Sequence, residues 1–204
     1  MNDLFTSFED SENEIIEYAE KELSSIIKLK DKIKEARLDL LKTDDPSWEQ
    51  QQKTKDSLRE IENQIANFQK LNEKLSVLNK QNEKNDLFSE GITEKFRDLQ
   101  KLVEEIFPPD IFQDMDAMRN ALEELNVDEM ISALEDISNN LNNVEQELDR
   151  FLDIFQRIKA EQKVDEIRKR VEQLVQNQDN LDQQIRSVNK QTDLSVFKRL
   201  SQEQ

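Results

Sequence analysis

The residues best able to do chemistry in this sequence are carboxylates that stand next to one another. Such pairs include Glu104 with Glu105, Glu123 with Glu124, Asp128 with Glu129, and Glu135 with Asp136. Carboxylate oxygens suit Ca²⁺ and Mg²⁺. Neighbouring residues of a helix, however, point about 100° apart and cannot chelate one ion together. We therefore interpret these pairs as solvated helix faces, and we expect no metal site.

The usual catalytic side chains are missing. Neither His nor Cys occurs in the 204 residues, which removes the commonest general base, the strongest nucleophile and the usual zinc ligands. The single glycine, Gly91, cannot form a glycine-rich phosphate loop or a dinucleotide fingerprint. The sequence therefore predicts a protein that is not an enzyme, with no catalytic residues, no cofactor and no small-molecule substrate.

The charge balance restricts the partners. Asp and Glu number 46 and Lys and Arg 29, which gives a formal net charge of -17. Such a field repels phosphate backbones, so we expect no nucleic-acid partner. No apolar run approaches the roughly 20 residues of a membrane span, and the first residues lack the pattern of a signal peptide. We expect no direct membrane insertion, and a cytoplasmic location if the chain is free-standing.

The elements that would position any site are helices. With one glycine and three prolines, the chain has few residues for the tight turns of a sheet. Charged residues make up 37% and apolar residues 35%, which favours a narrow apolar seam over a broad core. Disorder is the rival interpretation, but the apolar residues recur every three or four positions, the spacing of paired helices. The predicted fold class is all-α, built of extended antiparallel helical hairpins or coiled coils.

Breaks in this periodicity define the predicted organisation. An N-terminal hairpin, 1–84, has helices at about 9–42 and 46–84, and a second hairpin, 85–192, has helices at about 90–106, 110–125 and 128–192. Residues 193–204 are expected to form a frayed tail. A parallel homodimer is the alternative arrangement.

Several residues at these breaks have expected roles. Asp45 and Asp128 are predicted helix caps, and Pro46 is placed at the first helical position. Trp48 is expected to pack beneath Leu40 or Leu41.

In the predicted helix at 9–42, the apolar seam includes Ile16, Leu23 and Leu29, and an extra three-residue step at Leu29 would overwind it locally.

The candidate interaction residues lie on later helices. Seam positions at 90–106 and 128–158 are the candidate interaction sites: Phe96, Leu99, Val103, Leu141, Leu148, Phe151, Phe155 and Ile158.

The periodicity slips around 161–164 and resumes at Ile167, Val171 and Leu174. Beside the slip lies a candidate basic patch: Lys163, Arg168, Lys169 and Arg170. We expect this patch to neutralise carboxylates such as Glu145, Glu147, Asp149 and Asp153 on a neighbouring helix or subunit. The alternative is contact with an acidic partner or with lipid headgroups.

Six stretches carry a likeness to known proteins: 85–90, 96–102, 121–126, 128–130, 148–151 and 161–166. Through them residues 48–178 resemble a family of long bacterial cell-envelope proteins known only as a domain of unknown function. Members of that family have membrane helices near the N-terminus and a very long coiled coil rich in Glu, Lys and Gln. The resemblance, which is to the coiled-coil region only, implies a location in the cell envelope. It implies no activity and no catalytic residues.

These observations favour a structural or scaffolding coiled-coil protein whose partner is itself or another helical protein. A helical binding module, which captures a partner helix through an exposed apolar seam, is the second hypothesis.

Overall fold

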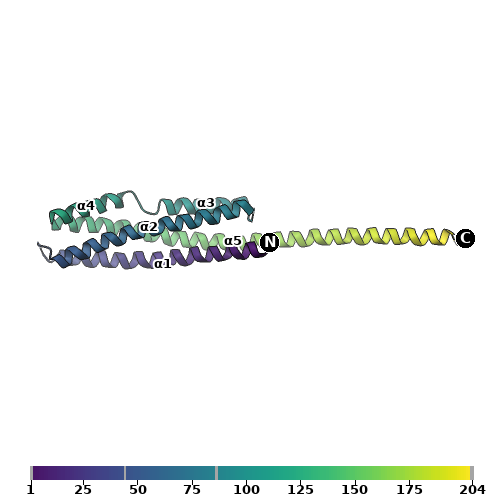
Figure 1. Ribbon diagram of the computed structural model, residues 1–204, viewed down its shortest axis with the longest axis horizontal. Coiled ribbons are helices and arrows are strands. Elements are labelled where there is room, and N and C mark those ends of the chain that lie inside the picture. The colour runs from purple at the N-terminus through teal and green to yellow at the C-terminus, as the bar shows by residue number, and fades with distance from the viewer. Residues whose placement is uncertain (1, 44, 86, 203–204) are drawn as a thin grey trace. The chain divides into compact units, whose positions relative to one another are not determined.

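The computed structural model describes residues 2–43, 45–85 and 87–202, and the side chains of 5–43, 45–85 and 87–186. In these residues the regular structure is entirely helical, as predicted for an all-α fold. The helices are α1 (Asn2–Leu40), α2 (Trp48–Asn85), α3 (Glu90–Glu104), α4 (Asp110–Glu124) and α5 (Val127–Gln202) (Figure 1).

The chain divides into two compact units, Met1–Lys159 and Ala160–Gln204. The boundary expected at 84/85 lies inside the first unit. The tail expected from residue 193 is helical through Gln202. Each unit is described by itself below.

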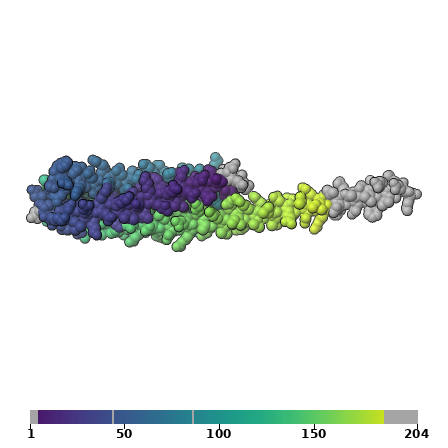
Figure 2. All heavy atoms as spheres, turned by 90° about the horizontal axis from the view of Figure 1, so that it is seen from below, coloured from purple at the N-terminus to yellow at the C-terminus, as the bar shows by residue number. Residues whose placement is uncertain are grey.

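In the first unit the helices form a bundle. α1 and α2 run side by side in opposite directions, α3 and α4 lie end to end, and residues 127–159 of α5 run back along them (Figure 1). Figure 2 shows α1 and this part of α5 packed closely on one face. Two ion pairs join these helices, Lys30 with Glu145 and, at 2.6 Å, Arg37 with Glu135. Short connections between long helices produce this alternating arrangement.

The seam of α1 corrects the expected one. Its buried positions alternate in steps of four and three without interruption: Phe8, Glu12, Ile15, Ala19, Glu22, Ile26, Leu29, Ile33, Ala36 and Leu40. Ile16 and Leu23, which were expected in the seam, are only partly buried. The overwound step predicted at Leu29 does not occur, because Ile15 and Glu22 hold the seam positions that were assigned to Ile16 and Leu23.

α2 also buries polar side chains. Near the end of the helix, Asn82 is 1% exposed. Its Nδ2 donates to Oγ1 of Thr93 at 2.8 Å, and its Oδ1 accepts from the backbone N–H of Phe88 at 3.2 Å. Asn82 therefore fastens the turn that leads from α2 into α3.

The helix starts differ from the predicted caps. α2 begins at Trp48, and Ser47 and Gln50 cap it reciprocally: the Ser47 N–H donates to Oε1 of Gln50 at 2.8 Å, and the Gln50 N–H to Oγ of Ser47 at 3.3 Å. This is a capping box. Asn126, not Asp128, caps α5 by accepting a hydrogen bond from the Glu129 N–H at 3.3 Å. Trp48 is 76% exposed, so its predicted packing beneath Leu40 or Leu41 is wrong.

α1 begins at Asn2, earlier than the predicted residue 9. An aromatic cluster holds this first part: the ring of Phe8 lies 5.2 Å from that of Phe88 and 6.1 Å from that of Phe96. Edge-to-face contacts of this kind add stability beyond the area they bury. The acidic stretch at the N-terminus is therefore helical, because its phenylalanines have partners on later segments.

Candidate interaction surface

The predicted seam residues lie in the core of the first unit. All eight of them, from Phe96 to Ile158, are buried. The ring of Phe96 contacts that of Phe155 across α3 and α5, with centroids 5.9 Å apart, and Phe155 lies 5.7 Å from Phe151. These side chains therefore interact within the chain.

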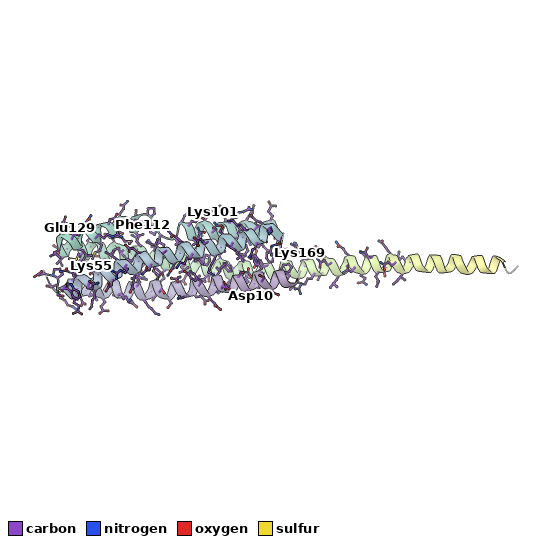
Figure 3. All side chains as sticks on the ribbon, in the orientation of Figure 1. Asp10, Lys55, Lys101, Phe112, Glu129 and Lys169 are labelled. Atoms are coloured by element: carbon purple, nitrogen blue, oxygen red, sulfur yellow. The ribbon has the colours of Figure 1, made fainter. Side chains whose placement is uncertain are left out.

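An exposed apolar stripe lies in the second unit, on α5. Of the fourteen large apolar side chains that are exposed among the described residues, seven fall within 164–185. In the first unit such residues are scattered, as Phe112 on α4 is in Figure 3. The seven are 52% to 68% exposed: Val164, Ile167, Val171, Leu174, Val175, Leu181 and Ile185. We call them the C-terminal stripe. An exposed group of this size marks an interaction site more often than isolated residues do.

The C-terminal stripe uses a different face of α5 from the core seam. The buried positions of α5 run through Phe155 and Ile158, and the same steps of four and three continue to Gln162 and Asp165. The stripe follows Val164 and Ile167 instead. A shift of two residues turns the apolar face by roughly 200° at 3.6 residues per turn. The slip predicted at 161–164 is thus a change of face, which makes the stripe a separate seam.

The basic patch pairs along its own helix. Arg168 lies 2.6 Å from Asp165 and 3.9 Å from Glu172, Lys169 lies 3.9 Å from Asp165, and Arg170 pairs with Glu166. The expected carboxylates have other partners where the structure shows them: Glu145 pairs with Lys30, and Glu147 with Arg150. Arg168 and Arg170 therefore pair with carboxylates three or four residues away on α5. Pairing of the patch with a neighbouring subunit stays a prediction.

Two surface grooves of about 420 Å³ each lie on the first unit. One lies between α1 and α2, where Ile15, Val77 and Leu78 form an apolar floor and Lys74 pairs with Glu14 at 3.3 Å. The other lies between α1 and α5 and is lined by charged and amide side chains, including the Arg37–Glu135 pair. Paired surface charges of this kind contribute little energy and are typical of a solvated helix face.

The shifted pKa values have local causes. Hydrogen bonds from Lys42 and Lys53 to the Asp39 carboxylate, at 2.9 and 3.2 Å, hold its pKa below the usual 3.8. Burial raises the pKa of Asp114, and a hydrogen bond from Asn140 opposes that shift. No group of three or more possible ligands could hold a metal ion in the described part of the chain.

The apolar content of the helices is also limited: within 2–43, 45–85 and 87–202, none is long and apolar enough to cross a membrane. Comparison with known proteins adds no relative: no family model, no curated protein and no solved structure matches this chain. Function is therefore inferred from the residues and their packing.

Sequence reasoning located Ile167, Val171 and Leu174 in a seam but did not separate that seam from the core. The signal that distinguishes the two is the two-residue shift at 162–164.

Proposed function

We propose that this protein is a non-enzymatic helical scaffold, joined to another helix through the C-terminal stripe. The observation that carries the proposal is the exposure of seven large apolar side chains within 164–185. All of them except Val175 fall on a coiled-coil seam with steps of three and four, in which Gln178 holds the position between Leu174 and Leu181. A seam of this kind is completed by a partner helix.

The composition of residues 164–186 indicates that this helical segment needs a packing partner for stability. Residues 164–186 contain five β-branched residues, three Asp and two Asn, which are types with low helix propensity. From Arg170 to Arg186 every side chain is exposed, and Figure 3 shows these side chains standing out around the helix. Because most helix stability in proteins comes from packing an apolar face, a partner would stabilise this segment.

The first unit supports the proposal in a different way. Its helices bury their seam residues against one another, and ion pairs between helices flank that core, such as Arg119 with Glu62 at 2.6 Å. A bundle whose apolar residues are covered by its own helices suits a spacer or platform. Assembly would then depend on the second unit.

A place in the cell envelope is the second part of the proposal. The resemblance to the coiled-coil region of membrane-anchored envelope proteins supports it. Most of the stretches that carry this resemblance fall in the helices of the bundle. The test is fractionation of cells that express the gene in its natural setting. Recovery with the envelope is expected, and recovery only with the cytosol would refute this part.

Sedimentation velocity over a wide concentration range tests the scaffold function. The variant Leu174→Glu/Leu181→Glu places charges in the stripe, and Ile27→Glu/Leu38→Glu places the same charges at exposed positions of the first unit. We expect the wild type and the Ile27→Glu/Leu38→Glu control to associate and the stripe variant to remain monomeric. Equal sedimentation of all three proteins would refute assembly through the stripe.

The same stripe also favours the second hypothesis, a module that captures a different helical protein. This alternative predicts a wild-type chain that stays monomeric at every concentration. It further predicts that a partner helix raises the helicity of the wild type and leaves the Leu174→Glu/Leu181→Glu variant unchanged.

A further inference from the structure

The C-terminal stripe fills the two facing positions of a heptad, conventionally lettered a to g. Position a holds Val164, Val171, Gln178 and Ile185, and position d holds Ile167, Leu174 and Leu181. Apolar residues at a and d form one continuous seam along the helix, and a second helix of similar length can cover such a seam. The pattern at a and d alone does not set the direction of that helix.

We propose that the partner is the same segment of a second copy, running antiparallel, with Val171 of one copy facing Leu181 of the other. This inference rests on the scaffold function proposed above and names its partner. In this alignment Val171 packs on Leu181, Ile167 on Ile185, and Leu174 on Gln178 of the second copy. Every exposed apolar residue at a or d between Ile167 and Ile185 then contacts a residue of the other copy.

Flanking charges select the antiparallel direction. Positions e and g border the seam and set partner orientation through their charges. In a parallel pair Lys163 at g would face Arg168 at e of the second copy, and two such like-charge contacts would form by symmetry. In the antiparallel pair Arg168 faces Asp182 of the second copy, which gives two attractive contacts. A parallel pair would let Gln178 meet its own copy, and β-branched residues at a with leucines at d also suit that direction. The flanking charges oppose it.

Val175 supports the same direction. This residue occupies position e and is 54% exposed, although e is usually a polar position. In the antiparallel alignment the two-fold axis passes beside it, so that Val175 lies next to Val175 of the second copy. In a parallel pair it would border Arg170 instead. The antiparallel pair thus covers an apolar side chain that the heptad alone does not explain, and its two-fold symmetry closes the assembly at a dimer.

Cysteine crosslinking tests the direction, since the chain has no cysteine of its own. Val171→Cys and Leu181→Cys are oxidised separately and as an equimolar mixture, then examined on a non-reducing gel. Antiparallel pairing predicts covalent dimer only in the mixture, because in each single variant the thiols are about 15 Å apart along the axis. Covalent dimer in each single variant would show a parallel pair and overturn the proposal.

A charge exchange gives a second readout. Arg168→Asp places two carboxylates opposite each other in the antiparallel pair, and we expect the dimer to dissociate about tenfold more readily. Arg168→Asp/Asp182→Arg should restore the affinity while keeping the same local change at residue 168. In a parallel pair Arg168→Asp would instead attract Lys163 and tighten the dimer.

The outcomes separate this inference from the scaffold function. A parallel dimer that Leu174→Glu/Leu181→Glu abolishes would refute the antiparallel pair and leave assembly through the stripe intact. A wild type that is monomeric at every concentration, with no crosslinking in the mixture, would refute the second copy as partner. A dimer unaffected by any change in the stripe would refute both.

Discussion

Asn67 of α2 donates a hydrogen bond from Nδ2 to Oε2 of Glu22 on α1, at 3.0 Å, inside the helical bundle. Glu22 is 1% exposed and occupies a seam position. A buried carboxylate is costly unless it has partners, so this contact between two helices offsets the cost of placing an acid in the core. It also aligns α1 with α2, because only one residue of α2 supplies the donor.

Removal of Asn67 should therefore destabilise the bundle. For Asn67→Ala we expect a loss of about 1–3 kcal/mol in the free energy of unfolding, measured by urea denaturation, because Glu22 loses its hydrogen-bond donor. Glu22→Leu provides the matched background, since the seam position then holds an apolar residue and the donor at residue 67 is no longer needed. A loss from Asn67→Ala that is equally large in the Glu22→Leu background would contradict a role through Glu22.

Tyr18, the one tyrosine of the chain, reports on the same region. Burial raises its pKa above 10.0, and the negative charge of Glu22 raises it further. A spectrophotometric titration should show phenolate forming above that value in the folded protein, with the midpoint moving back toward 10.0 in Glu22→Gln. A midpoint unchanged by Glu22→Gln would remove the carboxylate as a cause.

The raised pKa of Tyr18 also has a consequence for stability. The folded state holds the phenol proton more tightly than the unfolded chain does, so the contribution is fully present below pH 10.0. It is lost as the pH rises through the folded pKa. Thermal melts at increasing alkaline pH should show a loss of stability in the wild type that is smaller in Tyr18→Phe.

Asn82 offers a third test, at the turn between α2 and α3. Asn82→Ala leaves the Phe88 N–H and the Thr93 hydroxyl without this side chain as a partner, and we expect a cost of about 1–3 kcal/mol by urea denaturation. Asn85→Ala is the control, because its amide bonds only to the exposed Gln81 carbonyl on the same helix. Equal effects of the two variants would show that the side chain of Asn82 does not hold the turn.

The helices were predictable because apolar residues recur every three or four positions in all five of them. The exact seam was not. Ile15 and Ile16 are adjacent, as are Glu22 and Leu23, and each pair leaves two possible faces. A search for apolar residues takes Ile16 and Leu23, whereas the bundle buries Ile15 and Glu22. The choice depends on Asn67, a residue of another helix, and so cannot be made from α1 alone.

The interaction surface was predictable in part for a similar reason. Periodicity identifies seam residues but not what covers them, so Phe151 and Val171 look alike in the sequence. Phe151 lies in the core with Phe155, and Val171 is 52% exposed. The cap of α2 was predicted at Asp45, because Pro46 suggested that the helix starts there. The helix starts two residues later, and Ser47 and Gln50 cap it reciprocally.

The most direct test of the central claim, that a second copy covers the C-terminal stripe, is amide hydrogen exchange of residues 164–186 at increasing protein concentration. If a second copy covers the stripe, amide exchange in the wild type slows as the protein concentration rises. In Leu174→Glu/Leu181→Glu the exchange rate stays the same at every concentration. The core of α1 serves as an internal reference whose exchange should be the same in both proteins. Exchange in 164–186 that stays as fast as in an unfolded peptide at every concentration would contradict the claim.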